Sequence, residues 1–135
     1  MLDNDDIISK DIKDYHPIVL AYLGDAVFEL LVRTSMVTGE KRRIKDIHLD
    51  TVRIVNAESQ AKALREVFDD LSDEEKDIVR RGRNARSTPP RHADNGDYRL
   101  STGFEALLGY LYLQGESQRI QELVARALNN EAIIM

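Results

Sequence analysis

The sequence lacks the motifs that identify several common kinds of functional site. It contains no cysteine, which excludes a disulfide framework and a zinc site built from thiolates. It has no glycine-rich phosphate loop and no Gly-x-Ser-x-Gly nucleophile turn. The three histidines are too scattered for a zinc site: they are His16, His48 and His92. The candidates for chemistry that remain are carboxylates and arginines.

Long hydrophobic segments are also absent. The longest apolar runs are far too short to span a bilayer, and the acidic first residues, MLDNDD, are not typical of a secretory signal. With 135 residues, 42% of them hydrophobic and 32% charged, the composition is that of a globular protein rather than a disordered one. We therefore expect one domain over residues 1–135, with 1–15 as a flexible N-terminal segment, in the cytoplasm.

The hydrophobic pattern predicts an all-α fold of about six helices, since no strand-length alternation and no internal repeat stands out. Pro17 suits the first turn of a helix, and the apolar residues that follow it cover more than one helix face. This breadth indicates a helix that is central or buried in an interface. The predicted helices span residues 18–37, 44–49, 51–68, 73–86, about 102–113 and 116–129.

Capping residues and prolines mark several of the predicted boundaries. Ser72 and Glu75 form a capping-box pattern before the fourth helix. Pro89 and Pro90 forbid its continuation, so we expect one long loop over 87–100. Ser101 or Thr102 would cap the next helix, and Gly115 would end it.

Two carboxylates stand in the most apolar helical segments. Asp25 follows Gly24 in LAYLGDAVFELL (20–31), and Glu105 stands near the start of FEALLGYL (104–111). An ionised carboxylate among buried leucines is costly unless something pairs with it, so two acids on two core helices suggest one shared cation. Mg²⁺ usually needs only one or two protein carboxylates besides water. The structural alternative pairs Asp25 with an arginine and leaves Glu105 as a first-turn acid favoured by the helix dipole.

A third acid, Glu29, lies one turn after Asp25 and one turn before Arg33. An ion pair between residues four positions apart on a helix is the default interpretation. A ligand role for Glu29 is the alternative.

A basic segment without any acidic residue runs from 78 to 93, although the net charge of the chain is −5. Arginine and asparagine donors suit phosphate and ribose contacts, and a polyanion responds to the local field rather than to the net charge. The dipole at a helix C-terminus also favours cations, but five arginines exceed that need. We interpret the segment as a polyanion site, with these candidates: Arg80, Arg81, Arg83, Asn84, Arg86, Ser87 and Arg91.

The two acidic segments resemble those of a known family. YLGDAV (22–27) resembles the signature of the ribonuclease III catalytic domain, and FEALLGYLYL (104–113) resembles its second acidic motif. Together with RGRNARS (81–87), the chain is similar over about residues 16–130 to the compact Mini-ribonuclease III subfamily, which lacks the double-stranded-RNA-binding domain. The resemblance implies the ribonuclease III endonuclease fold in a homodimer, for which the apolar surface of the helix over 17–37 is the candidate interface.

The resemblance also implies an activity. Such an enzyme hydrolyses double-stranded RNA to 5′-phosphate and 3′-hydroxyl ends, and the implied substrate is precursor 23S ribosomal RNA. Asp25 and Glu105 match the catalytic acids that bind the metal, which implies Mg²⁺ with Mn²⁺ as an alternative, and the basic segment would contact the RNA.

Two positions depart from the pattern of the wider family. That family has a glutamate four residues before Asp25, where this chain has Ala21, and an aspartate three residues before Glu105, where it has Thr102. Water or Glu29 are the candidates for the vacated ligand positions, and the number of metal ions stays open. The departures motivate two alternatives to an enzyme: a catalytically inactive RNA-binding scaffold in ribosome assembly, and a structural helical dimer in which the two acids are ion-pair partners.

Overall fold

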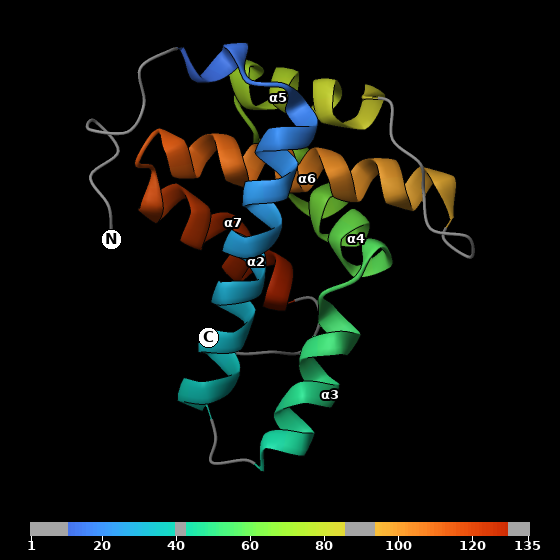
Figure 1. Ribbon diagram of the computed structural model, residues 1–135, viewed down its shortest axis with the longest axis vertical. Coiled ribbons are helices and arrows are strands. Elements are labelled where there is room, and N and C mark those ends of the chain that lie inside the picture. Colours follow the sequence, from blue (N-terminus) through green and yellow to red (C-terminus); the bar gives the residue numbers. More distant parts are fainter. Residues whose placement is uncertain (1–10, 40–42, 86–93, 130–135) are drawn as a thin grey trace.

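Helices pack around a central helix, α6, in the computed structural model (Figure 1). The structure describes residues 11–39, 43–85 and 94–129, and within these ranges it contains six α-helices, two short 3₁₀ helices and no strand. This confirms the predicted all-α class. The elements are η1 (Ile12–Asp14), α2 (Pro17–Gly39), α3 (Ile44–Ile54), α4 (Ala57–Val67), η2 (Phe68–Asp70), α5 (Asp73–Asn84), α6 (Asn95–Leu113) and α7 (Ser117–Asn129).

The core is built on α6, which α2, α4, α5 and α7 all contact. Every residue from 101 to 111 is buried except Glu105, because neighbouring helices cover the helix on several sides. Phe104 packs edge-to-face against Phe28 of α2, with ring centroids 5.7 Å apart, a favoured geometry for aromatic rings. The single acid among these apolar side chains is therefore the feature of α6 that packing does not explain.

The predicted break between helices at residue 50 and the predicted start of a helix near residue 102 are both wrong, because α3 continues to Ile54 and α6 begins at Asn95. Both errors come from missed caps. The helix predicted over 51–68 is interrupted, because Asn56 caps α4 by accepting a hydrogen bond from the Ser59 amide at 2.9 Å. Helix α6 begins at Asn95 rather than after Ser101 or Thr102, because Asp94 is its cap. Ser101 and Thr102 lie within the helix, and both hydroxyls donate to the Tyr98 carbonyl. Their hydrogen-bonding needs are therefore met by the preceding turn of the same helix.

Other boundaries are confirmed. Ser72 and Glu75 form both hydrogen bonds of the capping box at the start of α5. Gly115 has a φ of 76°, which lets the chain turn from α6 into α7. Residues 11–15, part of the segment expected to be flexible, pack on the core: Ile12 and Tyr15 contact it, and Lys13 pairs with Glu74 at 2.7 Å.

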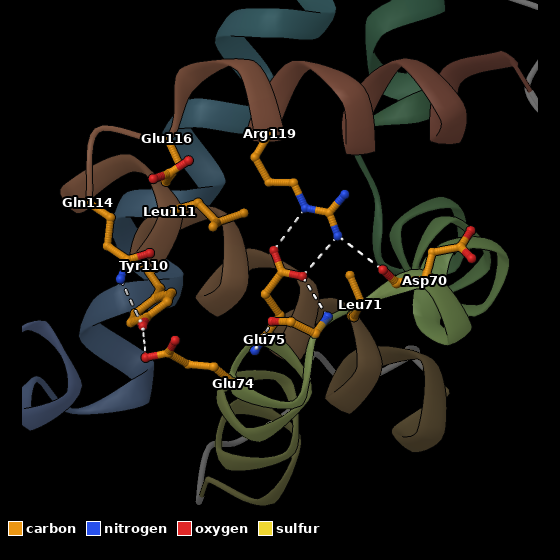
Figure 2. Close-up of a pocket in the computed structure, with 10 residues that line it drawn as sticks. Asp70, Leu71, Glu74, Glu75, Tyr110, Leu111, Gln114, Glu116 and Arg119 are labelled. Atoms are coloured by element: carbon orange, nitrogen blue, oxygen red, sulfur yellow. Dashed lines mark hydrogen bonds and ion pairs between the residues drawn. The ribbon is translucent and has the colours of Figure 1, made fainter.

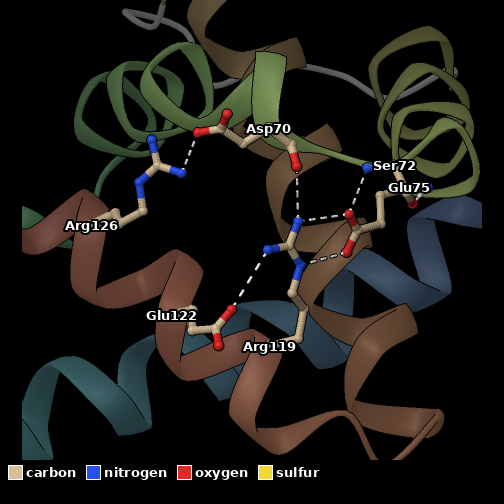
Figure 3. A network of polar contacts seen from close by, with 6 residues as sticks. All are labelled: Asp70, Ser72, Glu75, Arg119, Glu122 and Arg126. Carbon is tan, nitrogen blue, oxygen red and sulfur yellow. Dashed lines mark hydrogen bonds and ion pairs between the residues drawn. The ribbon is translucent and has the colours of Figure 1, made fainter.

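A polar network ties α7 to the start of α5 (Figure 3). Arg119 makes a bidentate contact with the carboxylate of Glu75, with both hydrogen bonds at 2.9 Å, and also donates to the carbonyl oxygen of Asp70 at 3.2 Å. Asp70 in turn pairs with Arg126. Arg119 lowers the pKa of Glu75, so this carboxylate stays charged. No helix among the described residues is both long and apolar enough to cross a membrane.

Candidate active site

The two predicted catalytic acids meet where α2 crosses α6. A Cβ atom on Gly24 would lie 1.7 Å from the carbonyl oxygen of Glu105, and one on Gly109 would lie 2.0 Å from that of Leu20. Both distances are far below van der Waals contact, so this approach of the two backbones requires glycine at both positions. Asp25 directly follows Gly24, and the crossing therefore brings its carboxylate into contact with that of Glu105.

The two acids have different environments, and the buried one is not the one expected. Asp25 is exposed rather than surrounded by leucines, whereas Glu105 is half-buried. Burial raises the pKa of Glu105 to about 8, and the nearby Asp25 carboxylate contributes to the rise. Two adjacent carboxylates are stable only when they share a proton or a cation, so the pair favours a bound cation.

A third helix contributes a partner that the sequence did not reveal. Gln60 of α4 is 3% exposed, and its amide nitrogen donates to Oε2 of Glu105 at 3.3 Å. This hydrogen bond lowers the pKa of Glu105, against the larger effects of burial and Asp25. The available signal was a glutamine on the face of α4 that otherwise carries Ala63, Leu64 and Val67, all buried.

The donor set fits a hard divalent cation that keeps most of its water ligands. Within residues 11–39, 43–85 and 94–129, no group of three or more histidine, aspartate or glutamate side chains could hold a metal ion. Mg²⁺ is commonly held by one or two carboxylates together with water, which is what Asp25 and Glu105 offer. Neither Asp25 nor Glu105 has a cationic partner in the contacts of the described residues, which does not favour their role as structural ion pairs.

The other candidate ligands do not join the pair. Glu29 pairs with Arg33 at 2.7 Å, as the default interpretation of their spacing predicts. Ala21 and Thr102, which replace acids of the wider family, are both buried, and the Thr102 hydroxyl donates to the Tyr98 carbonyl at 3.0 Å. Among the described residues, the site therefore has two carboxylates and one amide.

The basic candidates lie on a different side of α6. Arg80, Arg83 and Asn84 are exposed on the last turns of α5, and Gly82 between them packs against Gly103 of α6, where a Cβ on Gly82 would lie 2.9 Å from the Gly103 Cα. Gly103 and Glu105 are two positions apart, so they face roughly opposite sides of the helix. The structure thus brings the two acids together, but it does not place the described basic residues, Arg80, Arg83 and Asn84, in contact with them.

Arg81 differs from its neighbours. It is half-buried, and its guanidinium donates to the carbonyl oxygen of Tyr15 at 3.4 Å, which links α5 to the residues before α2. The remaining basic candidates, Arg86, Ser87 and Arg91, lie outside the described residues.

An open cavity of about 450 Å³ lies at the far end of α6 and is not the candidate site (Figure 2). Several of its polar groups have partners: the Tyr110 hydroxyl donates to Glu74 at 2.7 Å, Gln114 donates to Tyr110 at 2.9 Å, and the Glu75 carboxylate accepts hydrogen bonds from Arg119. These contacts stabilise the junction of α5, α6 and α7, and they hold Tyr110, Glu74 and Glu75 in structural interactions.

Comparison with known proteins identifies the family of the chain. The ribonuclease III domain family matches residues 18–116, a range that contains both acidic segments. A protein named Mini-ribonuclease 3 from Thermoanaerobacter sp. is 45% identical over 125 residues, which cover 91% of this chain and 88% of that protein. The Mini-ribonuclease 3 of Gloeobacter violaceus is 54% identical over 94 residues, which cover 70% of this chain and 69% of that protein.

A solved structure shows the same fold. The crystal structure of a protein from Fusobacterium nucleatum superposes with a TM-score of 0.83 at 32% sequence identity, over 91% of this chain and 99% of that one. The named relatives confirm the resemblance to the Mini-ribonuclease III subfamily, and the solved structure confirms the fold. The chain therefore belongs to the ribonuclease III domain family, whose members are hydrolytic endoribonucleases.

Proposed function

We propose that this endoribonuclease cleaves double-stranded RNA with Mg²⁺ held by Asp25 and Glu105, and that Mn²⁺ can replace Mg²⁺. The observation that carries the proposal is the contact between the two carboxylates at the α2–α6 crossing, where the pKa of Glu105 is raised to about 8. Such a pair binds a divalent cation with favourable electrostatics, because the cation removes the repulsion between the two acids.

The residues of the chain have separable roles in this reaction. When bound, Mg²⁺ supplies an activated water for in-line attack on the phosphodiester and neutralises charge on the phosphate. Asp25 is exposed, so RNA in solution can approach its carboxylate. Glu105 is half-buried on the central helix, so its carboxylate is held on a rigid element. A rigid ligand pair needs little reorganisation on the way to the transition state.

The basic end of α5 would bind the RNA backbone. Arg80, Arg83 and Asn84 are exposed there, and we include Arg81 together with Arg86, Ser87 and Arg91. Double-stranded RNA is recognised mainly by its shape and its 2′-hydroxyls, so we expect modest sequence selectivity. Affinity that depends on a few arginine–phosphate contacts falls steeply with salt.

A homodimer would provide one site for each RNA strand. The face of α2 away from α6 exposes large apolar side chains, with Tyr22 84% exposed and Val37 67% exposed. Val19 and Leu30 are also exposed on α2. An apolar strip of this kind is typical of a protein–protein interface, and Tyr22 lies three residues before Asp25, so the interface would border the active site.

The biological substrate that we propose is precursor 23S ribosomal RNA, processed in the cytoplasm to 5′-phosphate and 3′-hydroxyl ends. Support for this substrate comes from the similarity to proteins named Mini-ribonuclease 3. Incubation of the purified protein with a precursor 23S transcript, followed by mapping of the product ends, tests it. Cleavage at random positions along the transcript would contradict this substrate.

One assay tests the enzymatic proposal. The protein is incubated with long double-stranded RNA in low salt, with Mg²⁺ or with EDTA, beside Asp25→Asn and the matched control Asp77→Asn on the exposed face of α5. We expect cleavage by the wild type and the control in Mg²⁺, none in EDTA, and a loss of about 100-fold or more in Asp25→Asn. If the folded wild type binds the RNA without cleaving it, the protein is an RNA-binding scaffold instead. If it neither binds nor cleaves the RNA, the protein is a structural dimer.

A further inference from the structure

Gln60 is a buried polar residue that reaches the acidic pair from a third helix. It lies on α4, 45 positions before Glu105 in the chain, is 3% exposed, and its amide nitrogen is 3.3 Å from Oε2 of Glu105. The packing of α4 on α6 therefore sets this contact, and local sequence does not.

Core packing alone does not explain a glutamine at this position. The neighbouring buried residues of α4 are Ala61, Ala63, Leu64 and Val67, and an apolar side chain would fill the same place without a polar group to desolvate. A buried amide that lacks a hydrogen bond costs about 1–3 kcal/mol. The glutamine is thus stable here because it has a partner, and that partner is Glu105.

In the contact between Gln60 and Glu105, the amide is the hydrogen-bond donor and the carboxylate is the acceptor. An ionised carboxylate can only accept hydrogen bonds, whereas an amide both donates and accepts. The donor end of Gln60 faces Glu105, which suits the charged carboxylate that binds a cation. The hydrogen bond from Gln60 is made to Oε2 of Glu105, so it fixes the orientation of the carboxylate that contacts Asp25.

We propose that Gln60 is a positioning residue that orients the Glu105 carboxylate toward a divalent cation shared with Asp25. The inference rests on the proposed metal site and adds a third helix, α4, to the parts of the fold that build it. Groups that hydrogen-bond to a metal ligand commonly contribute 10–100-fold in metal affinity or activity. We expect an effect of that size, expressed in the metal dependence of the reaction rather than in RNA binding.

The substitution Gln60→Met tests the proposal. Methionine is close to glutamine in length and slightly larger in volume but has no N–H donor, so it can fill the same place between α4 and α6. The matched control is Gln118→Met, at an exposed position on α7. The probe is Mn²⁺ alone, titrated by electron paramagnetic resonance in the absence of RNA, and Mg²⁺-dependent cleavage gives kcat and the KM for RNA.

For Gln60→Met we expect Mn²⁺ affinity to fall 10–100-fold, a matching rise in the Mg²⁺ concentration at half-maximal rate, and an unchanged KM for RNA. Excess Mg²⁺ should restore kcat, which it would not do if the substitution merely damaged the fold. Gln118→Met should behave as the wild type. Unchanged Mn²⁺ affinity would overturn the proposal, and so would a loss of activity that follows thermal unfolding and resists excess Mg²⁺.

Asp25→Asn, measured in the same titrations, separates this inference from the function on which it rests. If Asp25→Asn loses Mn²⁺ binding and Gln60→Met does not, the metal site stands and the role of Gln60 is wrong. If Asp25→Asn binds Mn²⁺ as tightly as the wild type, the metal site itself is wrong.

Discussion

Replacing Gly24 with alanine should disable the active site while leaving most molecules folded. The new Cβ would lie 1.7 Å from the Glu105 carbonyl oxygen, and ordinary contact begins at 3.4 Å, so α2 and α6 must separate locally by up to 3.4 − 1.7 = 1.7 Å. Overpacking of this kind costs about 1–3 kcal/mol, of which the better helix propensity of alanine returns up to about 1 kcal/mol. We expect a net loss of about 2 kcal/mol in the free energy of unfolding.

The effect of Gly24→Ala on cleavage should be larger than its effect on stability. Asp25 follows Gly24 and moves with α2, while Glu105 moves with α6, so the separation acts directly on the carboxylate pair. A displacement of about 1 Å at a reacting centre can cost about 100-fold in rate. We therefore expect a loss of about 100-fold in Mg²⁺-dependent cleavage at a temperature where circular dichroism shows the variant to be folded.

Gly39→Ala is the matched control, since a Cβ there meets nothing within 4 Å. This variant should cleave as the wild type does and be slightly more stable, because alanine loses less backbone entropy than glycine in a helix. Wild-type cleavage and melting temperature in Gly24→Ala would refute the reasoning, since they would mean that the two helices do not need so close an approach.

Three further predictions concern charged groups. Between about pH 4.5 and about 8, Glu105 is protonated in the folded state because its pKa is raised, but ionised in the unfolded state. As the pH rises through this range, the free energy of unfolding of the metal-free wild type should therefore fall by up to about 1.4 kcal/mol per pH unit. Glu105→Gln should abolish this loss in thermal melts, and a persistent slope would contradict the assignment. Arg119→Met leaves Glu75 buried without its partner and should cost about 3 kcal/mol in urea unfolding at pH 7. Because the pKa of Glu75 is lowered in the folded state, that cost should shrink below pH 4.5 as the carboxyl is protonated, and a constant cost would count against the ion pair. Arg80→Ala and Arg83→Ala should each reduce the salt slope of RNA binding by about 1, as measured by fluorescence anisotropy across KCl concentrations; unchanged slopes would remove them from the RNA surface.

Local sequence signals predicted the elements of this fold and missed some of their ends. The capping box at Ser72 marked α5 correctly because both of its hydrogen bonds are local. Asp94 and Asn56 were missed as caps because aspartate and asparagine occur equally in loops, and only the helix that follows distinguishes the two cases. The apolar breadth of α2 indicated a helix that is central or buried in an interface, and the structure shows α2 packed on α6 with Tyr22 and Val37 exposed.

The sequence by itself determined which side chains could carry the chemistry of this protein. The apolar surroundings of Asp25 and Glu105 in the sequence made their carboxylates the candidate metal ligands, and their motifs indicated the family. Tertiary structure alone decided that Glu105 is the more buried acid, that Gly24 and Gly109 let the two acids meet, and that Gln60 approaches from α4. The reason is physical: side-chain type and helix periodicity are local properties, whereas burial, the pKa of Glu105 and the contact with Gln60 arise only when helices distant in the sequence pack together.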